Sequence, residues 1–175
     1  GGTVAEDGIT GVRLSDTYPG NCFQEFQRAI LRLRDRGVLL AINSKNHAED
    51  VLGMFRSHPH MILREEHFSA IRINWNDKAE NLEDIARALN LGLDALVFMD
   101  DCAVECERVR QASPEVLVVH LPPQRHAYRS TLEGLRCFDQ VTVTAEDRSR
   151  SAFYRGRAER EALASQSGTL DAFYA

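Results

Sequence analysis

The sequence lacks the features that would assign it to a membrane or a nucleic acid. No apolar stretch approaches the ~20 residues that cross a bilayer, and the first residues lack the basic-then-apolar pattern of a signal peptide. The formal net charge of -5 leaves no basic excess with which to neutralise nucleic-acid phosphates. We therefore expect a cytoplasmic protein that binds neither membrane nor nucleic acid.

Paired cysteines and glycine-rich loops are also missing. The four cysteines show no Cys-x-x-Cys spacing, so neither a zinc ribbon nor a disulfide framework is indicated. No Gly-rich loop of the Walker or dinucleotide type occurs, so a nucleotide cofactor is not supported. What remains is a chain of 175 residues, 43% hydrophobic and 27% charged, which suits one domain with one substantial core.

Short apolar runs alternate with helical patterns along the chain. The runs are typical of buried parallel strands and fall at residues 38–42, 61–63, 96–99 and 116–119, of which 61–63 is the weakest. Hydrophobic residues recur at helical spacing within 23–33 and within 82–89. This alternation predicts an α/β fold with a three-layer, doubly wound parallel sheet, whose ligands bind at the carboxyl ends of the strands.

The last part of the chain differs in composition from the rest. Thr144 and Asp147 resemble a helix-start capping box, and they predict an Arg-studded helix from residue 145 to about residue 164. We divide the chain into a core at 1–143 and an Arg-rich helix and tail at 144–175. Acidic residues interrupt the arginines, which favours a solvated helix over a docking surface for an acidic protein.

The ordered set Ser44, Lys78, Asp100 and Asp101 carries the strongest chemical signal. Ser44 and the two aspartates follow predicted buried strands, whose carboxyl ends are rigid platforms. A hydroxyl and an ammonium can hold phosphate oxygens, while carboxylates can hold a magnesium ion that offsets the charge of a transferring phosphoryl group. Each residue alone is typical of an ordinary strand end or solvated turn. The set favours phosphoryl transfer, because adjacent aspartates repel each other unless a cation or donors offset them.

These residues resemble motifs of the haloacid dehalogenase superfamily. Ser44-Lys45-Asn46 is similar to the second motif of its phosphatases, Lys78 to the third and Asp100-Asp101 to the fourth. The resemblance implies that the second motif and Lys78 hold phosphate, and that the aspartate pair holds Mg²⁺. Asn81 is a weaker candidate for a phosphate or carboxylate contact.

A finer resemblance, to the FkbH-like family, spans nearly the whole chain. It lies in Gly1-Gly2-Thr3-Val4 with Glu6-Asp7-Gly8, Tyr18-Pro19-Gly20-Asn21, Ile73-Asn74-Trp75 leading to Lys78, and Thr144-Ala145-Glu146-Asp147-Arg148. It implies a magnesium-dependent glyceryltransferase/phosphatase. Such a domain dephosphorylates a phosphoglyceryl donor and delivers the glyceryl unit, by way of a thiol, to an acyl carrier protein in polyketide biosynthesis.

One motif of the superfamily is missing. Its first motif, Asp-x-Asp, supplies the nucleophile, and in FkbH-like proteins it lies just before the Gly-Gly with which this chain begins. The strand that carries it would lie between the strands predicted at 38–42 and 96–99. We therefore expect a gap at the centre of the sheet, and interpret the chain as a piece of a longer protein, with a degenerate relative as the alternative.

A transferase also needs a thiol, and two cysteines are candidates. Cys22 lies at a predicted helix start, where the helix dipole favours the nucleophilic thiolate, although a half-buried packing role is equally compatible with this position. Cys102 follows the acidic pair, whose negative charge disfavours a thiolate, and ranks second. Cys106 and Cys137 fall within helical patterns and are interpreted as small core residues.

Two other functions remain open. The first is a plain small-molecule phosphatase with no thiol step, and the second is a non-catalytic module that docks carrier proteins.

Trp75 could shape the mouth of the site near Lys78, but a lone tryptophan is more often a packing anchor. The residues His58-Pro59-His60 are interpreted as exposed histidines in a turn and not as a metal pair.

Overall fold

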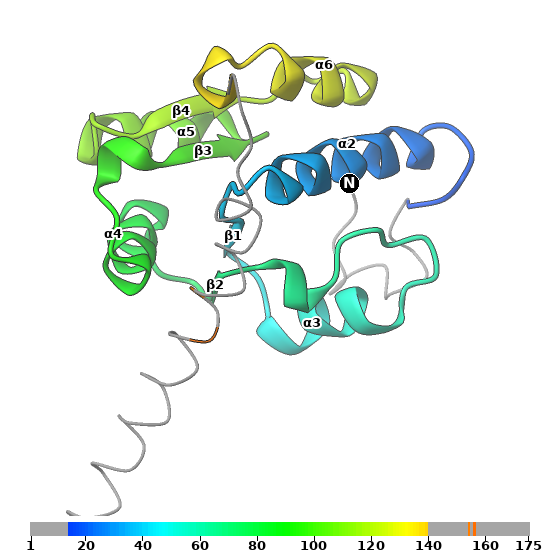
Figure 1. The fold of residues 1–175 in the computed structure, drawn as a ribbon, viewed down its shortest axis with the longest axis horizontal. Coiled ribbons are helices and arrows are strands. Elements are labelled where there is room, and N and C mark those ends of the chain that lie inside the picture. Colours follow the sequence, from blue (N-terminus) through cyan, green and yellow to red (C-terminus); the bar gives the residue numbers. More distant parts are fainter. Residues whose placement is uncertain (1–13, 140–153, 155, 157–175) are drawn as a thin grey trace, which may run out of the picture.

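The computed structural model describes residues 14–139 together with Tyr154 and Gly156. Four short strands occur in this part of the chain: β1 (Ala41–Ser44), β2 (Ala70–Ile73), β3 (Val97–Asp100) and β4 (Leu117–His120). They pair in parallel as two separate sheets, β1 with β2 and β3 with β4. The parallel pairing and the alternation with helices confirm the predicted α/β class (Figure 1).

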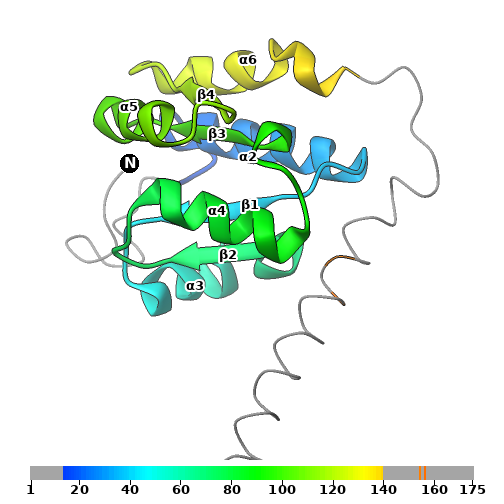
Figure 2. The same ribbon diagram turned by 90° about the vertical axis from the view of Figure 1, so that its left-hand side faces the viewer.

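Helices cover both sides of these strands. They are α2 (Gly20–Asp35), α3 (Ala48–Ser57), α4 (Lys78–Leu89), α5 (Ala103–Ala112) and α6 (Tyr128–Glu133), with 3₁₀ turns η1 (Glu65–His67), η2 (Leu93–Ala95), η3 (Arg125–Ala127) and η4 (Arg136–Phe138). Helices α4 and α5 lie on one side of the strands, α2 and α3 lie on the other, and α6 packs on α2 (Figures 1 and 2). This is the predicted three-layer arrangement. Among the described helices, none has the length and apolar character needed to cross a membrane.

Helix α4 illustrates how local sequence sets these elements. Its N-cap, Asp77, accepts a hydrogen bond from the backbone N–H of Ala79 at 2.8 Å, which satisfies one of the free donors of the first turn. The helix ends at Asn90, which takes the left-handed conformation with φ of 52°. Between these caps, Leu82, Ile85 and Leu89 form the buried face that the sequence period predicts.

The core consists of two buried clusters, one for each sheet. The cluster beside β3 and β4 contains the side chains of Cys106 and Val109, both fully buried. Burial raises the pKa of the Cys106 thiol, and the charge of Asp100 adds to this effect. The prediction that Cys106 is a core residue is therefore confirmed. The other cluster joins Ala70 of β2 to α4, and Tyr154 packs against it.

No strand lies between β1 and β3 in the described part of the chain. Instead, a cavity of about 890 Å³ separates the two sheets. Its walls are mainly apolar and include residues of both facing strands, of α2 and of α4: Ala41, Val97, Phe98, Met99, Ile30, Leu33, Leu82, Ile85 and Leu89. Within the described part of the chain, the gap expected at the centre of the sheet is thus present between β1 and β3.

Three details of the sequence interpretation are wrong. Residues 61–63 form no strand, because the backbone N–H groups of Ile62 and Leu63 both donate to Oε1 of Gln27, at 2.9 Å each. The strand that pairs with β1 is Ala70–Ile73. Cys137 is exposed in the turn η4 and is not a core residue.

The third error concerns His58, which is buried and not exposed in a turn. Its Nδ1 accepts the backbone N–H of His60 at 3.3 Å, and burial is the main cause that lowers its pKa. The predicted capping box at Thr144 lies outside the described residues, and so does the predicted boundary at residue 143 between the core and the C-terminal helix. Within the predicted C-terminal helix, Tyr154 and Gly156 are described, and both are helical.

The open cavity predicts low stability for the 175-residue chain. Among the described residues, the inner edges of β1 and β3 have no partner strand, and the walls between them are mainly apolar. We expect a broad thermal transition below the ~45–65 °C range of ordinary domains, measured by circular dichroism, together with binding of a hydrophobic dye. A sharp transition at high temperature without dye binding would contradict this expectation.

Candidate active site

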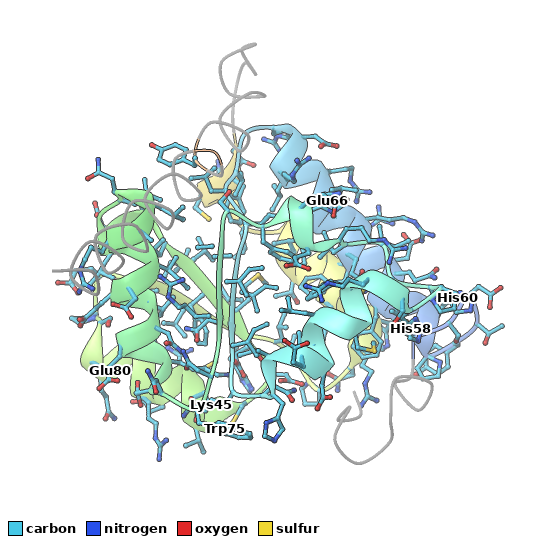
Figure 3. All side chains as sticks on the ribbon, turned by 90° about the horizontal axis from the view of Figure 1, so that it is seen from below. Lys45, His58, His60, Glu66, Trp75 and Glu80 are labelled. Atoms are coloured by element: carbon cyan, nitrogen blue, oxygen red, sulfur yellow. The ribbon has the colours of Figure 1, made fainter. Side chains whose placement is uncertain are left out.

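Polar residues gather at the carboxyl ends of β1 and β3. Ser44 is the last residue of β1, and Asp100 is the last residue of β3. Because the strands within each pair are parallel, the loops that follow them, and the helix starts after those loops, lie at the same edge of each sheet. Figure 3 shows Lys45 and Trp75 at this edge, with His58 and His60 apart from them.

Lys78 and Asp100 form a buried ion pair at this edge. Lys78 is the first residue of α4 and is 8% exposed, and its Nζ donates to Oδ2 of Asp100. The ammonium also lies 5.8 Å from the ring centroid of Phe98. The other carboxylate oxygen of Asp100, Oδ1, accepts the backbone N–H of Cys102 at 2.8 Å. The structure therefore brings the third and fourth motifs together through a direct contact.

Asp101 is exposed, in contrast to Asp100. Its carbonyl oxygen lies 3.3 Å from Nε2 of His120, while its carboxylate makes no hydrogen bond within the described part of the chain. The pKa of Tyr128 is raised, mainly by burial and then by the charge of Asp101. Of the two aspartates, Asp101 is thus the one whose carboxylate is available to a cation.

The second motif reaches toward α5. Nζ of Lys45 lies 2.9 Å from Oε1 of Glu105, which is in the first turn of α5, and this ion pair links the β1 side of the cavity to the β3 side. Oε2 of Glu105 is buried and has no hydrogen-bond partner among the described residues. Asn46 accepts the backbone N–H of His47 through Oδ1 at 2.9 Å. The amide of Asn46 therefore supports the start of α3.

Three asparagine side chains form a hydrogen-bonded network beneath the site. Nδ2 of Asn81, a residue 1% exposed, donates to Oδ1 of Asn43 at 3.1 Å and to Oδ1 of Asn74 at 2.9 Å. Asn74 returns a bond from its Nδ2 to Oδ1 of Asn81, at 3.1 Å. Nδ2 of Asn43 donates to the carbonyl of Lys78 at 2.8 Å. The amide of Asn81 is thus bonded to two protein partners, and its assignment as a phosphate or carboxylate contact stays a prediction.

The two candidate thiols lie at helix starts. Cys22 is half-buried in the first turn of α2, and its Sγ donates to Oδ1 of Asn21 at 3.6 Å. Cys102 is exposed at the N-cap of α5, directly after the aspartate pair. Among the described residues, Cys102 contacts the proposed magnesium and phosphate site directly, through the bond from its backbone N–H to Asp100, whereas Cys22 contacts Asn21.

Sequence reasoning missed the Asn43 and Asn74 amides and the role of Glu105. The sequence carries a signal for Asn43, which directly follows the predicted strand 38–42, but none for Asn74, because the strand before it is not predicted. No sequence signal pairs Lys45 with Glu105, because the two residues are 60 positions apart. Trp75 was interpreted mainly as a packing anchor, and this is wrong, because its side chain is 66% exposed.

Comparison with solved structures places this fold among phosphatase domains. The chain superimposes with a TM-score of 0.77 and 34% identity on the N-terminal part of the protein BF1531 from Bacteroides fragilis, described as containing a phosphatase domain complexed with Mg. The match covers 81% of this chain and 38% of that one, so this chain spans well under half of the neighbour's length. No protein-family model matches the chain, and no curated protein does. The haloacid dehalogenase-like, Rossmann-like fold expected from the motifs is confirmed at this level.

Proposed function

We propose that the chain is part of a magnesium-dependent phosphatase of the haloacid dehalogenase superfamily. The contact between Lys78 and Asp100 carries this proposal, because it joins two motif residues that are 22 positions apart. The likeness to a Mg-bound phosphatase domain at 34% identity supports it. We assign phosphate binding to Ser44 and Lys78, with Lys45 beside them.

The oxygen chemistry of the site fits Mg²⁺. This ion prefers carboxylate oxygen and keeps several waters or phosphate oxygens, so one or two carboxylates are enough. Asp101 offers an exposed carboxylate, and Asp100 lies next to it. The described residues contain no cluster of three or more His, Cys, Asp or Glu side chains that could hold a metal, so the remaining ligands would be water or phosphate or would come from outside these residues. A bound Mg²⁺ would offset the charge of the transferring phosphoryl group.

The chain's own residues have separate roles in this proposal. The ammonium of Lys78 is held in place by Asp100 and lies ready to donate to a phosphate oxygen. The hydroxyl of Ser44 can donate to a second phosphate oxygen. The nucleophilic carboxylate would come from a strand in the cavity between β1 and β3. The cavity reaches Asn43 and Met99, so such a strand would end between Ser44 and Asp100.

Substitution of Asp101 tests the metal assignment. In a longer chain that carries the Asp-x-Asp strand, Asp101→Asn should raise the magnesium concentration needed for half-maximal phosphate release by roughly tenfold or more, because one of few anionic ligands is lost. The control, Glu83→Gln, makes the same chemical change at an exposed position of α4. Equal and small effects of the two changes would exclude Asp101 from the metal site.

The finer function that we propose is glyceryl transfer to an acyl carrier protein. The FkbH-like stretches support it, including Tyr18-Pro19-Gly20-Asn21 at the start of α2 and Ile73-Asn74-Trp75 at the end of β2. Cys22, in the first turn of α2, is the proposed thiol, because a helix N-terminus favours a thiolate by about 0.3–1 kcal/mol. Cys102 is the second candidate, since it adjoins the aspartate pair. The plain phosphatase differs from this function only in lacking the thiol step.

Two cysteine variants separate these functions. In the longer chain, Cys22→Ala should abolish the glyceryl mass on the carrier protein, as seen by intact-mass spectrometry, and should leave phosphate and magnesium binding unchanged. Cys102→Ala is the matched control with the same change at another helix start. The reverse pattern would make Cys102 the acceptor. If the wild-type chain releases phosphate and never loads the carrier, the plain phosphatase is correct.

A further inference from the structure

Trp75 places a large apolar surface in solvent beside the candidate site. Its side chain is 66% exposed, and Figure 3 shows it at the same edge as Lys45. Within the part of the chain that the structure describes, its ring contacts that of His47, whose centroid lies 5.5 Å away at an interplanar angle of 73°. His47 is itself exposed. About two-thirds of the Trp75 side chain is therefore open to solvent and accessible to a ligand.

The loop that carries Trp75 is held firmly on both sides. The backbone N–H of Asn74 donates to the carbonyl of Ser44 at 3.1 Å, and the side chain of Asn74 is bonded twice to Asn81. The backbone N–H of Asn76 donates to Oδ1 of Asn74 at 3.1 Å. Trp75 directly follows Asn74, whose backbone contacts Ser44. An exposed ring on a fixed loop is pre-organised for binding, because little conformational entropy is lost when a ligand covers it.

The chemistry around Trp75 defines what it would contact. Lys78 is 8% exposed and Ser44 is half-buried, so a phosphate held by them leaves the rest of its ester directed outward. The ammonium of Lys45, the cation of the second motif, is already paired with Glu105. An indole face suits C–H-rich groups, and its N–H can donate to a hydroxyl. These surroundings fit an uncharged chain better than a second anion.

We propose that Trp75, with His47 at its edge, is the contact surface for the organic part of a phosphomonoester, a short alkyl or polyol chain whose phosphate lies against Ser44 and Lys78. This inference rests on the proposed phosphate site. It assigns to Trp75 a role in selecting the substrate, and none in binding phosphate itself.

The single tryptophan of the sequence makes this contact directly observable. Because Trp75 is the one tryptophan among 175 residues, all indole fluorescence of the chain comes from it. At a temperature below the thermal transition expected for the 175-residue chain, we expect n-butyl phosphate and glycerol 3-phosphate, added with Mg²⁺, to shift its emission to shorter wavelength. Inorganic phosphate, which has no organic part to cover the ring, should leave the emission maximum unchanged.

Calorimetry on variants completes the test. Trp75→Ala should weaken n-butyl phosphate binding by about tenfold, which is about 1.4 kcal/mol, and leave inorganic phosphate binding within about twofold; Trp75→Phe should recover most of the loss. The control is Leu117→Ala, because Leu117 is an exposed large hydrophobic residue, at 45%, and starts β4 at the end of the strand away from the site. This control should change the affinity for neither ligand.

The outcomes separate this inference from the function beneath it. If the wild-type chain binds inorganic phosphate but Trp75→Ala weakens both ligands equally or neither, the substrate contact is wrong and the phosphate site stands. If the wild-type chain is folded by circular dichroism and binds neither inorganic phosphate nor the esters, the phosphate site fails and the contact fails with it. Because Trp75 is exposed, its replacement should leave the melting temperature nearly unchanged, which a thermal scan verifies.

Discussion

Lys78→Met is expected to destabilise the chain strongly and to abolish phosphate binding. The side chains of Lys78 and Asp100 are 10% and 11% exposed, so methionine would leave a buried carboxylate without its cation. Removing one partner of a buried pair costs about 3–5 kcal/mol. In the longer chain that carries the Asp-x-Asp strand, urea unfolding measures the loss of stability, and calorimetry with inorganic phosphate measures the loss of binding.

The control for Lys78→Met is Arg87→Met on the same helix. Arg87 pairs with Asp84, but the two side chains are 73% and 47% exposed, and such surface pairs contribute less than about 1 kcal/mol. The double variant Lys78→Met with Asp100→Leu removes both charges and should recover much of the stability, although not the phosphate binding. If Lys78→Met is as stable as Arg87→Met, the pair does not hold the two motifs together.

The helices and strands with a strong hydrophobic pattern could be predicted from the sequence, whereas strand β2 could not. The apolar face of α4 and the run before Asp100 are strong patterns, and the structure contains both. β2 contains the charged residue Arg72, so its sequence does not read as an apolar run. Residues 61–63 do form an apolar run, but they are not a strand. What decides between them is a partner: Ala70–Ile73 pairs with β1, whereas the amides at 62 and 63 bind the side chain of Gln27.

The motif residues of the candidate site could likewise be predicted from the sequence, whereas the contacts between them could not. Motif residues could be located because each follows a predicted strand or starts a helix, and a family resemblance marks them. Contacts between motifs could not be located, since Lys78 meets Asp100, and Lys45 meets Glu105, only after the sheets and helices have packed. The amide network has the same origin, because it joins β1, the loop after β2 and α4. Residue type indicates the chemistry, whereas tertiary packing determines which groups remain free to bind a ligand.

Asn81→Leu is expected to be the second most damaging change. Leucine is similar in size to asparagine but makes no hydrogen bond, so Oδ1 of Asn43 and the amide of Asn74 would each lose a partner. An unsatisfied buried polar group costs about 1–3 kcal/mol, and two such groups imply a loss of roughly 3 kcal/mol. Urea unfolding of the longer chain that carries the Asp-x-Asp strand measures this loss. Glu80→Leu, an exposed position one residue earlier in α4, is the matched control.

The Asn81 variant also tests whether the network positions the site. Asn43 donates to the carbonyl of Lys78, and Asn74 donates to the carbonyl of Ser44, so loosening the network should move both phosphate-binding residues. Hydrogen exchange should then accelerate at the amides of Asn74 and of the first turn of α4, and inorganic phosphate should bind more weakly. Faster exchange throughout the chain would indicate a general loss of stability instead. A variant that loses stability but keeps full phosphate affinity and slow local exchange would show that the network supports the fold alone and that Ser44 and Lys78 are positioned without it.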